Sequence, residues 1–188
     1  HILDLCLMFI GGQQVIDCKL KTLECNSEEE IQSGAAGWFS KEEGSRFMID
    51  VEESAIADIR FKGGIKLHTV LSWHAPVKAD STYFKITGSK GRVELKTLFG
   101  FSNERLWKED QLTLSREGKE QVFILDKKIN NTMNAFGDML SYFTEALVKG
   151  ETKSVDYKDA YRIVSVTEKL YRSNEKNMIC HISVPEEE

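Results

Sequence analysis

The stretch AIADIRFKGGIKLHTVLSW, residues 55–73, decides the fold class. Its apolar and polar side chains alternate in two runs on either side of Gly63-Gly64. A period of two residues is typical of β-strands that bury one face and expose the other. Because the two glycines separate the runs, we predict an antiparallel hairpin with one buried face.

The length of the turn follows from the pattern. A two-residue loop would place Phe61 opposite Lys66 and mix apolar and polar side chains on each face. A three-residue loop, Lys62–Gly64, keeps the faces separate, and we therefore predict it. Its register gives the cross-strand pairs Phe61–Ile65, Ile59–Leu67 and, on the other face, Asp58–His68.

The same alternation continues downstream and predicts two more hairpins. Residues 83–87 and 92–96 flank Gly88–Gly91 in a register that pairs Ile86 with Val93, Phe84 with Leu95 and Lys85 with Glu94. The other hairpin consists of one strand with the apolar residues Leu112 and Leu114 and a second strand over residues 122–125. Residues 28–43 are polar and contain glycine, so we predict a loop there.

Helical periodicity occurs in three places. Apolar residues recur at helical spacing over residues 133–147, in a pattern that ends at Gly150, and again over residues 156–171, where Asp156 is the expected cap. Residues 1–10 read as a helix that ends at Gly11-Gly12. With strands expected at 15–23 and 178–184, the sequence predicts an α+β two-layer sandwich: a large, predominantly antiparallel open sheet with helices packed on one face.

Composition narrows the functional classes. The chain has 188 residues, a net charge of −5 and 41% hydrophobic residues, which is typical of one globular domain. The scattered Lys and Arg argue against nucleic-acid binding, and no apolar run is long enough to span a membrane. The four cysteines form no C-x-x-C pair, so we expect small buried side chains in a cytoplasmic protein without a zinc or other metal site.

The motifs taken in order resemble those of one enzyme family. The set comprises the apolar helix that begins with His1-Ile-Leu-Asp4, Val51–Ala55 before the Gly-Gly hairpin, Ser72-Trp73, Ile86–Gly91, Val155–Ala160 and Tyr171–Ser173. Together they resemble the C-terminal domain of the glucose-fructose oxidoreductase and inositol dehydrogenase family.

The resemblance implies an arrangement of two domains. Residues 1–188 would form a single C-terminal substrate and oligomerisation domain. A Rossmann domain that binds NAD or NADP would precede it and is absent from this chain, so we expect no cofactor on the chain alone. The family's catalytic Lys would also lie upstream, as would an Asp four residues before the His that starts the first helix of the family's second domain. Only that His position is present, as His1.

Four residues are the candidate site. The resemblance makes His1 the group that takes a hydroxyl proton, and an imidazole suits this role because its ordinary pKa lies near neutrality. Asp4 falls on the same helix face and could orient the ring. In the family, the stretch that contains Lys78 and Asp80 runs near the substrate, and both side chains suit a sugar hydroxyl or a carboxylate.

Two other patterns could suggest a metal site and a phosphate site, but neither supports one. His68 and His74 lie about 20 Å apart along a strand, which is too far for one metal ion. The stretch Gly88–Gly91 joins two strands and does not open a helix, so we interpret it as a hairpin turn and not as a phosphate cradle.

The leading hypothesis is therefore the substrate-binding and dimerisation domain of an NAD(P)-dependent dehydrogenase, expected to be inactive without its N-terminal domain. Its substrate would be a sugar, polyol or related hydroxy compound, and the open sheet face would pair with a second copy. Two alternatives stay open. One is a non-catalytic module that assembles through its sheet face, and the other is a different enzyme class that uses Asp58, His68 and Trp73 on that face.

Overall fold

The computed structural model describes residues 1–24, 28–30, 46–48, 52–72, 79–99, 105–125, 132–150 and 157–181. It confirms the α+β class, with helices and antiparallel sheets. The chain divides into two compact units, residues 1–75 with 156–188 and residues 76–155. Across the described ranges, no helix combines the length and the apolar character that a membrane span requires.

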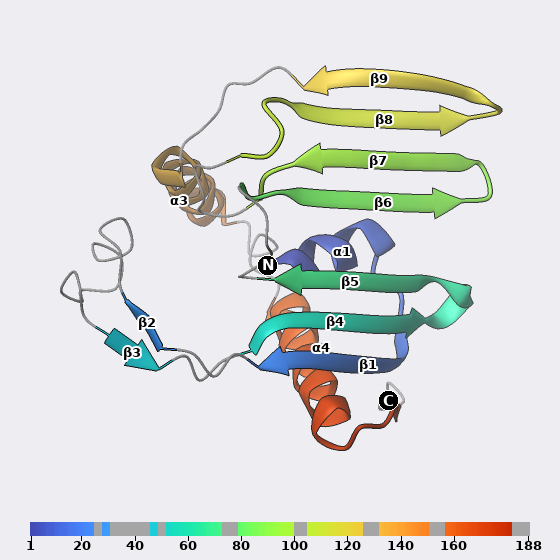
Figure 1. The fold of residues 1–188 in the computed structure, drawn as a ribbon. Coiled ribbons are helices and arrows are strands. Elements are labelled where there is room, and N and C mark those ends of the chain that lie inside the picture. The colour runs from blue at the N-terminus through green and yellow to red at the C-terminus, as the bar shows by residue number, and fades with distance from the viewer. Residues whose placement is uncertain are drawn as a thin grey trace. The chain divides into compact units, whose positions relative to one another are not determined.

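The first unit has one four-stranded antiparallel sheet in the order β10-β1-β4-β5. Figure 1 shows β1, β4 and β5 side by side. Its elements are α1 (Ile2–Ile10), β1 (Val15–Glu24), β4 (Glu52–Phe61), the short 3-10 turn η1 (Lys62–Gly64), β5 (Lys66–Ser72), α4 (Tyr157–Glu175) and β10 (Cys180–His181). A two-stranded ribbon of β2 (Glu28–Glu30) and β3 (Arg46–Met48) also belongs to this part of the chain.

The predicted register of the deciding hairpin is confirmed. Ile59 lies opposite Leu67, and Asp58 lies opposite His68. The three-residue turn is closed by a hydrogen bond from the Phe61 N–H to the Ile65 carbonyl, 2.9 Å long. The pattern succeeded because a one-residue slip would have moved every apolar side chain of the hairpin to the solvent face.

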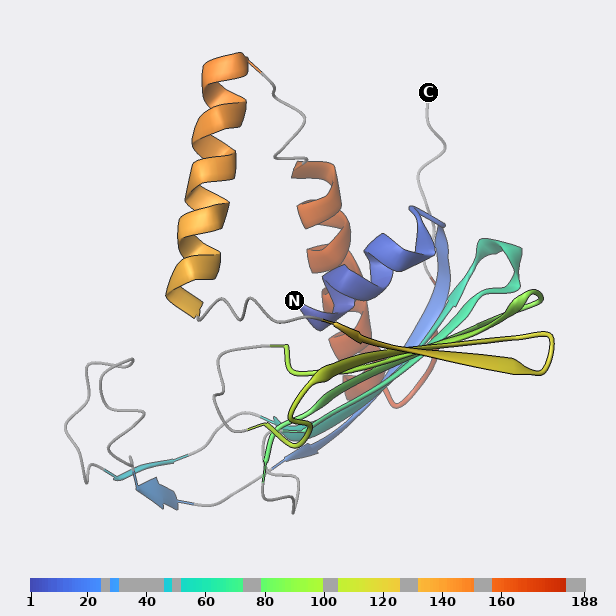
Figure 2. The same cartoon turned by 90° about the horizontal axis from the view of Figure 1, so that it is seen from above.

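Both helices of the first unit lie on the same side of its sheet (Figure 2). The apolar stripes of α1 and α4 and the inner face of β1 and β4 share one core because each would otherwise stay exposed to water. Its buried members are Leu7, Val15, Cys18, Leu20, Ala57, Ile59, Phe61, Val166 and Leu170. As predicted, α1 ends at Gly11, whose φ of 72° permits the left-handed cap and whose N–H donates to the Leu7 and Met8 carbonyls.

The C-terminal turn of α4 covers part of the free edge of β1. Among the described residues, β10 pairs with β1 at Asp17 and Cys18, and the N–H groups of Leu20 and Thr22 farther along that edge bond to side chains of α4 instead of to a strand. Leu20 donates its N–H to the buried Ser173 Oγ at 2.8 Å, and Thr22 donates to the Asn174 Oδ1 at 3.3 Å. These side chains satisfy edge groups that would otherwise invite pairing with another chain.

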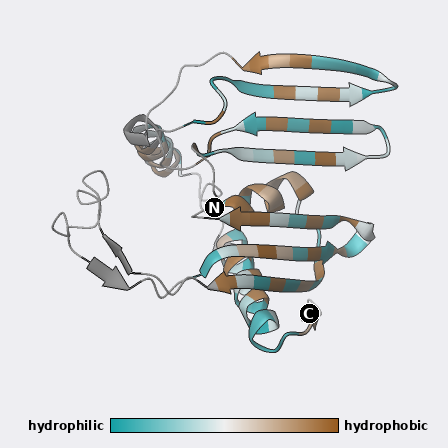
Figure 3. Cartoon of the chain, in the orientation of Figure 1, coloured by the Kyte–Doolittle hydropathy of each residue, from teal (hydrophilic) through white to brown (hydrophobic). Residues whose placement is uncertain are grey.

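The second unit contains a meander of four antiparallel strands in the order β6-β7-β8-β9, followed by α3. The elements are β6 (Thr82–Gly88), β7 (Gly91–Thr97), β8 (Asp110–Arg116), β9 (Lys119–Leu125) and α3 (Thr132–Lys149). Both predicted hairpins are confirmed, including the pairs Phe84–Leu95, Lys85–Glu94 and Ile86–Val93. Figure 3 shows the hydropathy alternating along these strands, as a sheet with one apolar face requires.

The structure differs from the prediction in two places. Glu28–Glu30 pairs with Arg46–Met48, although we predicted a loop for residues 28–43. Three consecutive glutamates have low strand propensity, and the pairing partner lies 16 or more residues away, so no local signal revealed it. The last strand, predicted from Met178 to Val184, begins at Cys180, and residues 182–184 lie outside the described residues. The expected cap Asp156 lies outside the described residues.

Candidate functional site

The first candidate position is the N-terminal end of α1. His1 occupies the N-cap position, where its carbonyl accepts the Leu5 N–H at 3.1 Å. The side chain of His1 is exposed. Leu7 anchors the inner side of this helix in the core, and the exposed His1 stands at the N-terminal end of the helix.

Asp4 lies in the first turn of the same helix and is also exposed. A carboxylate in this position interacts favourably with the positive end of the helix dipole. His1 is the N-cap residue of α1, and Asp4 lies three residues later, inside the helix. Among the described contacts, no hydrogen bond or ion pair joins their side chains, so the orienting role of Asp4 stays a prediction.

The second candidate position belongs to the other unit and centres on Asp80. Its backbone forms an isolated parallel bridge with Arg105, and its carbonyl accepts the Leu106 N–H at 2.9 Å. The Asp80 side chain remains exposed. The backbone of this residue is thus fixed while its carboxylate is free to meet a ligand. Lys78, the other residue predicted here, lies outside the described residues.

A polar network beside Asp80 was missed from the sequence. Asp110 accepts a hydrogen bond from the Thr97 hydroxyl at 2.8 Å and forms an ion pair with Arg105. The three side chains come from the end of β7, the start of β8 and the segment between them. The second predicted hairpin consists of β6 and β7, so its register does not say which strand lies on the other side of β7. The pairing of β7 with β8 is what brings Thr97 beside Asp110.

The face of the first unit's sheet that points away from its helices carries charged pairs. We call this the outer face and define it by Ile56, Asp58, Arg60, His68 and Val70. His68 Nδ1 lies 2.8 Å from Asp58 Oδ1, which confirms the predicted cross-strand neighbours.

A second pair on the same face involves Asp17, which is only 3% exposed. Arg60 donates through Nε to Asp17 Oδ1 at 2.8 Å and through a second nitrogen to Oδ2. The hydrogen bond to Asp17 is the main reason that the pKa of Arg60 lies above its ordinary value. His181 Nδ1 lies 3.9 Å from the same carboxylate. Fork-shaped pairing of this kind fixes side chains in place and compensates a buried charge.

Apolar side chains lie exposed between these charges. Ile56 is 42% exposed and Val70 is 63% exposed. The outer face therefore mixes exposed apolar groups with ordered charges, a composition that is common where proteins associate.

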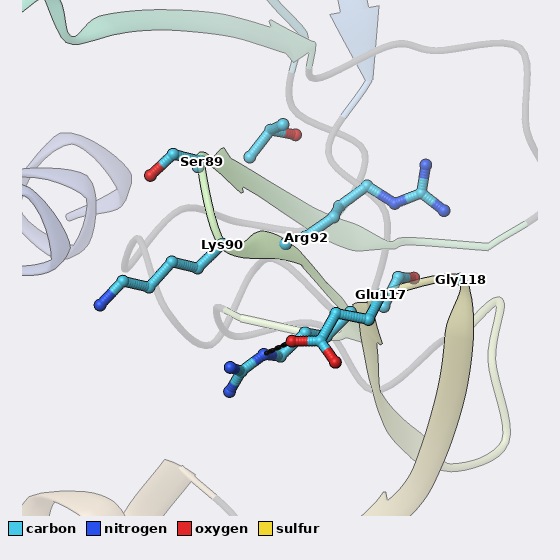
Figure 4. A pocket seen from close by; sticks show the side chains of 10 residues that line it. Ser89, Lys90, Arg92, Glu117 and Gly118 are labelled. Atoms are coloured by element: carbon cyan, nitrogen blue, oxygen red, sulfur yellow. Dashed lines mark hydrogen bonds and ion pairs between the residues drawn. The ribbon is translucent and has the colours of Figure 1, made fainter.

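A hollow lies at the tips of the two hairpins of the second unit (Figure 4). It has a volume of about 730 Å³ and is lined by the turns around Lys90 and Glu117. The interpretation of Gly88–Gly91 as a hairpin turn is confirmed, because this stretch joins β6 to β7. In Figure 4, Lys90 and Arg92 extend in different directions.

The cations around this hollow are largely paired. Arg116 Nε lies 3.2 Å from Glu117, and Arg92 Nε lies 2.9 Å from Glu94. The hollow thus presents no convergent set of free positive groups for a phosphate.

The described residues offer no site that fits a metal or a dinucleotide. They contain no group of three or more His, Cys, Asp or Glu side chains close enough to hold a metal ion. Their glycine turns lie in hairpins or after helices, at Gly63-Gly64, Gly118 and Gly150 for example. A pyrophosphate needs such a turn before the N-terminus of a helix.

Comparisons with known proteins identify the family of this chain. Residues 1–183 match the family described as "Oxidoreductase family, C-terminal alpha/beta domain". No curated protein shows a significant match to the chain.

Several solved structures share the fold at low sequence identity. Levoglucosan dehydrogenase in complex with NADH and L-sorbose has 14% identity and a TM-score of 0.69, with 97% of this chain and 49% of that chain covered. Aldose-aldose oxidoreductase from Caulobacter crescentus, complexed with glycerol, has 14% identity and a TM-score of 0.63, with 96% and 44% covered. The transcriptional regulator Gal80p from Kluyveromyces lactis has 14% identity and a TM-score of 0.66, with 96% and 43% covered. The chain thus spans less than half the length of these proteins.

Proposed function

Because the chain belongs to the C-terminal alpha/beta domain of the glucose-fructose oxidoreductase and inositol dehydrogenase family, we propose that it binds substrate within an NAD(P)-dependent dehydrogenase. We also propose that this domain forms the dimer contact of that enzyme. The enzyme would transfer a hydride between the dinucleotide and a sugar, polyol or related hydroxy compound in the cytoplasm. The observation that carries the proposal is the family match over residues 1–183, which covers nearly the whole chain. Two solved structures with this fold are complexes with L-sorbose and with glycerol, respectively, which supports the substrate class.

The dinucleotide would bind to a Rossmann domain outside this chain, since the described glycine turns do not fit a pyrophosphate. The contribution of this chain is the movement of a proton and the binding of substrate. His1 would accept the proton of the substrate hydroxyl on its imidazole, and Asp4 would hold the ring in the productive orientation. Their exposed positions at the start of a core-anchored helix support these roles.

Asp80 and Lys78 are proposed to bind the hydroxyl groups of the substrate. The fixed backbone and exposed carboxylate of Asp80 support this assignment. A carboxylate held in this way accepts hydrogen bonds from two neighbouring hydroxyls, whereas a lysine donates to them. The Arg105–Asp110 pair would keep the Asp80 backbone in place.

The catalytic role of His1 is tested by His1→Asn in the protein that includes its cofactor-binding domain. Turnover should fall by about 10²–10⁴, because general acid–base catalysis contributes about this factor, while the affinity for NAD or NADP stays the same. The matched control is His181→Asn, which removes another exposed imidazole and should leave turnover unchanged. Full activity in His1→Asn, or an equal loss in the control, would exclude His1 from catalysis.

Dimerisation is proposed to use the outer face. The exposed Ile56 and Val70 and the ordered pairs Asp58–His68 and Asp17–Arg60 support this surface over the opposite one, which α1 and α4 occupy. A two-fold contact lets one patch bury itself against its own copy, and homo-oligomers most often have this symmetry.

A second candidate function is a non-catalytic module that only binds or assembles. The observation in its favour is that the transcriptional regulator Gal80p from Kluyveromyces lactis has the same fold. Reduction of NAD or NADP in the presence of polyols distinguishes the two. Turnover by the protein with its cofactor-binding domain supports the dehydrogenase, and cofactor binding without turnover on any polyol or sugar supports the module.

A further inference from the structure

Two cysteines face each other across neighbouring strands of the first unit. In the register of β1 and β10, Cys18 lies directly opposite Cys180. Both side chains point to the same side of the sheet, because Cys18 is a member of the buried core and Cys180 packs against that core. Both thiols are free.

The spacing of an antiparallel pair is compatible with a bond between these sulfurs. Directly opposed residues have Cα atoms about 4.5–5.5 Å apart, and a disulfide joins Cα atoms about 4.4–6.8 Å apart. Opposed Cβ atoms, at about 4.5–5.5 Å, lie slightly farther apart than the usual 3.5–4.5 Å of a disulfide. A small approach of the short strand β10 would close this difference.

The two thiols differ in their access to solvent. Cys180 is partly exposed, whereas Cys18 is only 1% exposed. Burial, and secondarily the neighbouring Cys180, raise the pKa of the Cys18 thiol to about 11. Cys18 is thus a poor first nucleophile for an external reagent, and Cys180 is the sulfur that such a reagent meets.

We propose that Cys18 and Cys180 form an oxidisable dithiol site, which a small-molecule disulfide converts into a cross-strand disulfide. Neither the family match nor the proposed dehydrogenase function requires this site. It is a place of covalent modification on the side of the sheet opposite the outer face.

The reaction proceeds by two exchanges. The sulfur of Cys180 attacks one sulfur of the small-molecule disulfide, the S–S bond of the reagent breaks, and one thiol leaves with the proton of Cys180. The sulfur of Cys18 then attacks the sulfur of Cys180 in the mixed disulfide, and the second reagent thiol leaves with the proton of Cys18. The two protein thiols are oxidised by two electrons, and the reagent is reduced to two thiols.

The bond would tie β10 to β1. The pairing of these strands is described only at Asp17–His181 and Cys18–Cys180, so a covalent link at one of the two positions holds the short strand in its register. It also closes a loop of more than a hundred residues, which restricts the unfolded chain.

The test is incubation of the folded protein with oxidised glutathione. We expect an intact mass lower by two hydrogen atoms, and a peptide map without reductant that links the peptides of Cys18 and Cys180. The thermal midpoint should rise by roughly 5–10 °C and return on reduction.

Two variants separate this site from general thiol oxidation. Cys180→Ser should abolish both the mass change and the thermal shift, and Cys18→Ala provides the same test from the other strand. Cys6→Ser, which removes another buried thiol, should leave both unchanged. The proposal is overturned by a stable glutathione adduct on Cys180 with Cys18 still free, by a link to Cys6 or Cys25, or by no reaction of the folded protein.

Discussion

Ser173 shows how one buried hydroxyl can join two elements. Its side chain is completely buried, accepts the Leu20 N–H at 2.8 Å and donates to the Leu170 carbonyl at 2.6 Å. A buried polar group is tolerated only when its hydrogen bonds are made, so the hydroxyl and the β1 N–H depend on each other.

Ser173→Ala should therefore lower the free energy of unfolding by about 1–3 kcal/mol, because the Leu20 N–H would stay buried without a partner. Urea unfolding measures the change. The matched control is Ser165→Ala in the same helix, for which the described contacts include no side-chain hydrogen bond and which should change stability by less than about 0.5 kcal/mol. An equal effect of both variants would show that helix propensity, and not the bond to β1, is responsible.

Tyr171 links the stability of the protein to alkaline pH. Its hydroxyl donates to Glu52, and this bond, followed by burial, raises the pKa of Tyr171 to about 12. A tyrosine in the unfolded chain has a pKa near 10. Folding favours the neutral form of Tyr171. Its contribution to the free energy of unfolding is therefore complete below about pH 10 and is lost as the pH rises toward 12.

An ultraviolet titration of tyrosine should accordingly include a late ionisation, that of Tyr171, in the wild type. Glu52→Gln should shift that step to lower pH, because the carboxylate that holds the phenol proton is replaced by a neutral amide. The same variant should lose less stability than the wild type between pH 10 and 12. An identical late step in both proteins would contradict the role of Glu52.

At the scale of elements, the close approach of β7 and β8 depends on one glycine. Gly91 has a φ of 146°, and a Cβ placed there would lie 2.4 Å from the Ser115 carbonyl oxygen on β8. That separation is shorter than any van der Waals contact, and the atom in the way belongs to the backbone. The strands would have to separate locally to admit a side chain.

Gly91→Ala should destabilise the protein by about 1–3 kcal/mol through this clash and the unfavourable φ. Gly88→Ala, at the other end of the same turn, is the control, since a Cβ there meets nothing within 4 Å. Guanidinium unfolding followed by circular dichroism would reveal the difference. Equal midpoints for the two variants would mean that β7 and β8 adjust freely.

The elements that the sequence predicted correctly are the local ones. Ile59–Leu67 and Phe84–Leu95 pair as expected because short turns and a two-residue period leave few alternatives for the register. Two other pairings could not be predicted in this way. β1 and β10 lie at opposite ends of the chain, and β7 and β8 are separated by a longer segment that contains Arg105. The alternation of residues within a strand does not specify such neighbours.

The same distinction applies to the candidate site. The apolar pattern predicted a helix over residues 1–10, and the structure has α1 from Ile2 to Ile10 with His1 as its N-cap and Asp4 in its first turn. The chemical roles of His1 and Asp4 came from the resemblance and not from their spacing. The Asp17–Arg60 pair was not anticipated, because Asp17 follows a β-bulge between Val15 and Asp17 that shifts the register of β1. A two-residue period cannot predict where such a shift occurs.

At the scale of the whole molecule, self-association is the property to measure. Val70→Asp should convert a dimer into a monomer in sedimentation at micromolar concentration, because it places a charge among the apolar groups of the outer face. Val164→Asp on α4 is the matched control, since Val164 and Val70 are 66% and 63% exposed, respectively. Wild-type protein that sediments as a monomer, or a dimer that survives Val70→Asp, would contradict the proposed interface.

The first unit is discontinuous in sequence, because residues 76–155 separate its two segments. During synthesis, β1, β4 and β5 leave the ribosome well before α4, which supplies Val166 and Leu170 to their core. The meander of the second unit is built from hairpins of low contact order and can form as soon as its own residues emerge. We therefore expect the middle of the chain to acquire its structure first, while the apolar face of the earlier strands waits for a helix that is translated more than eighty residues later.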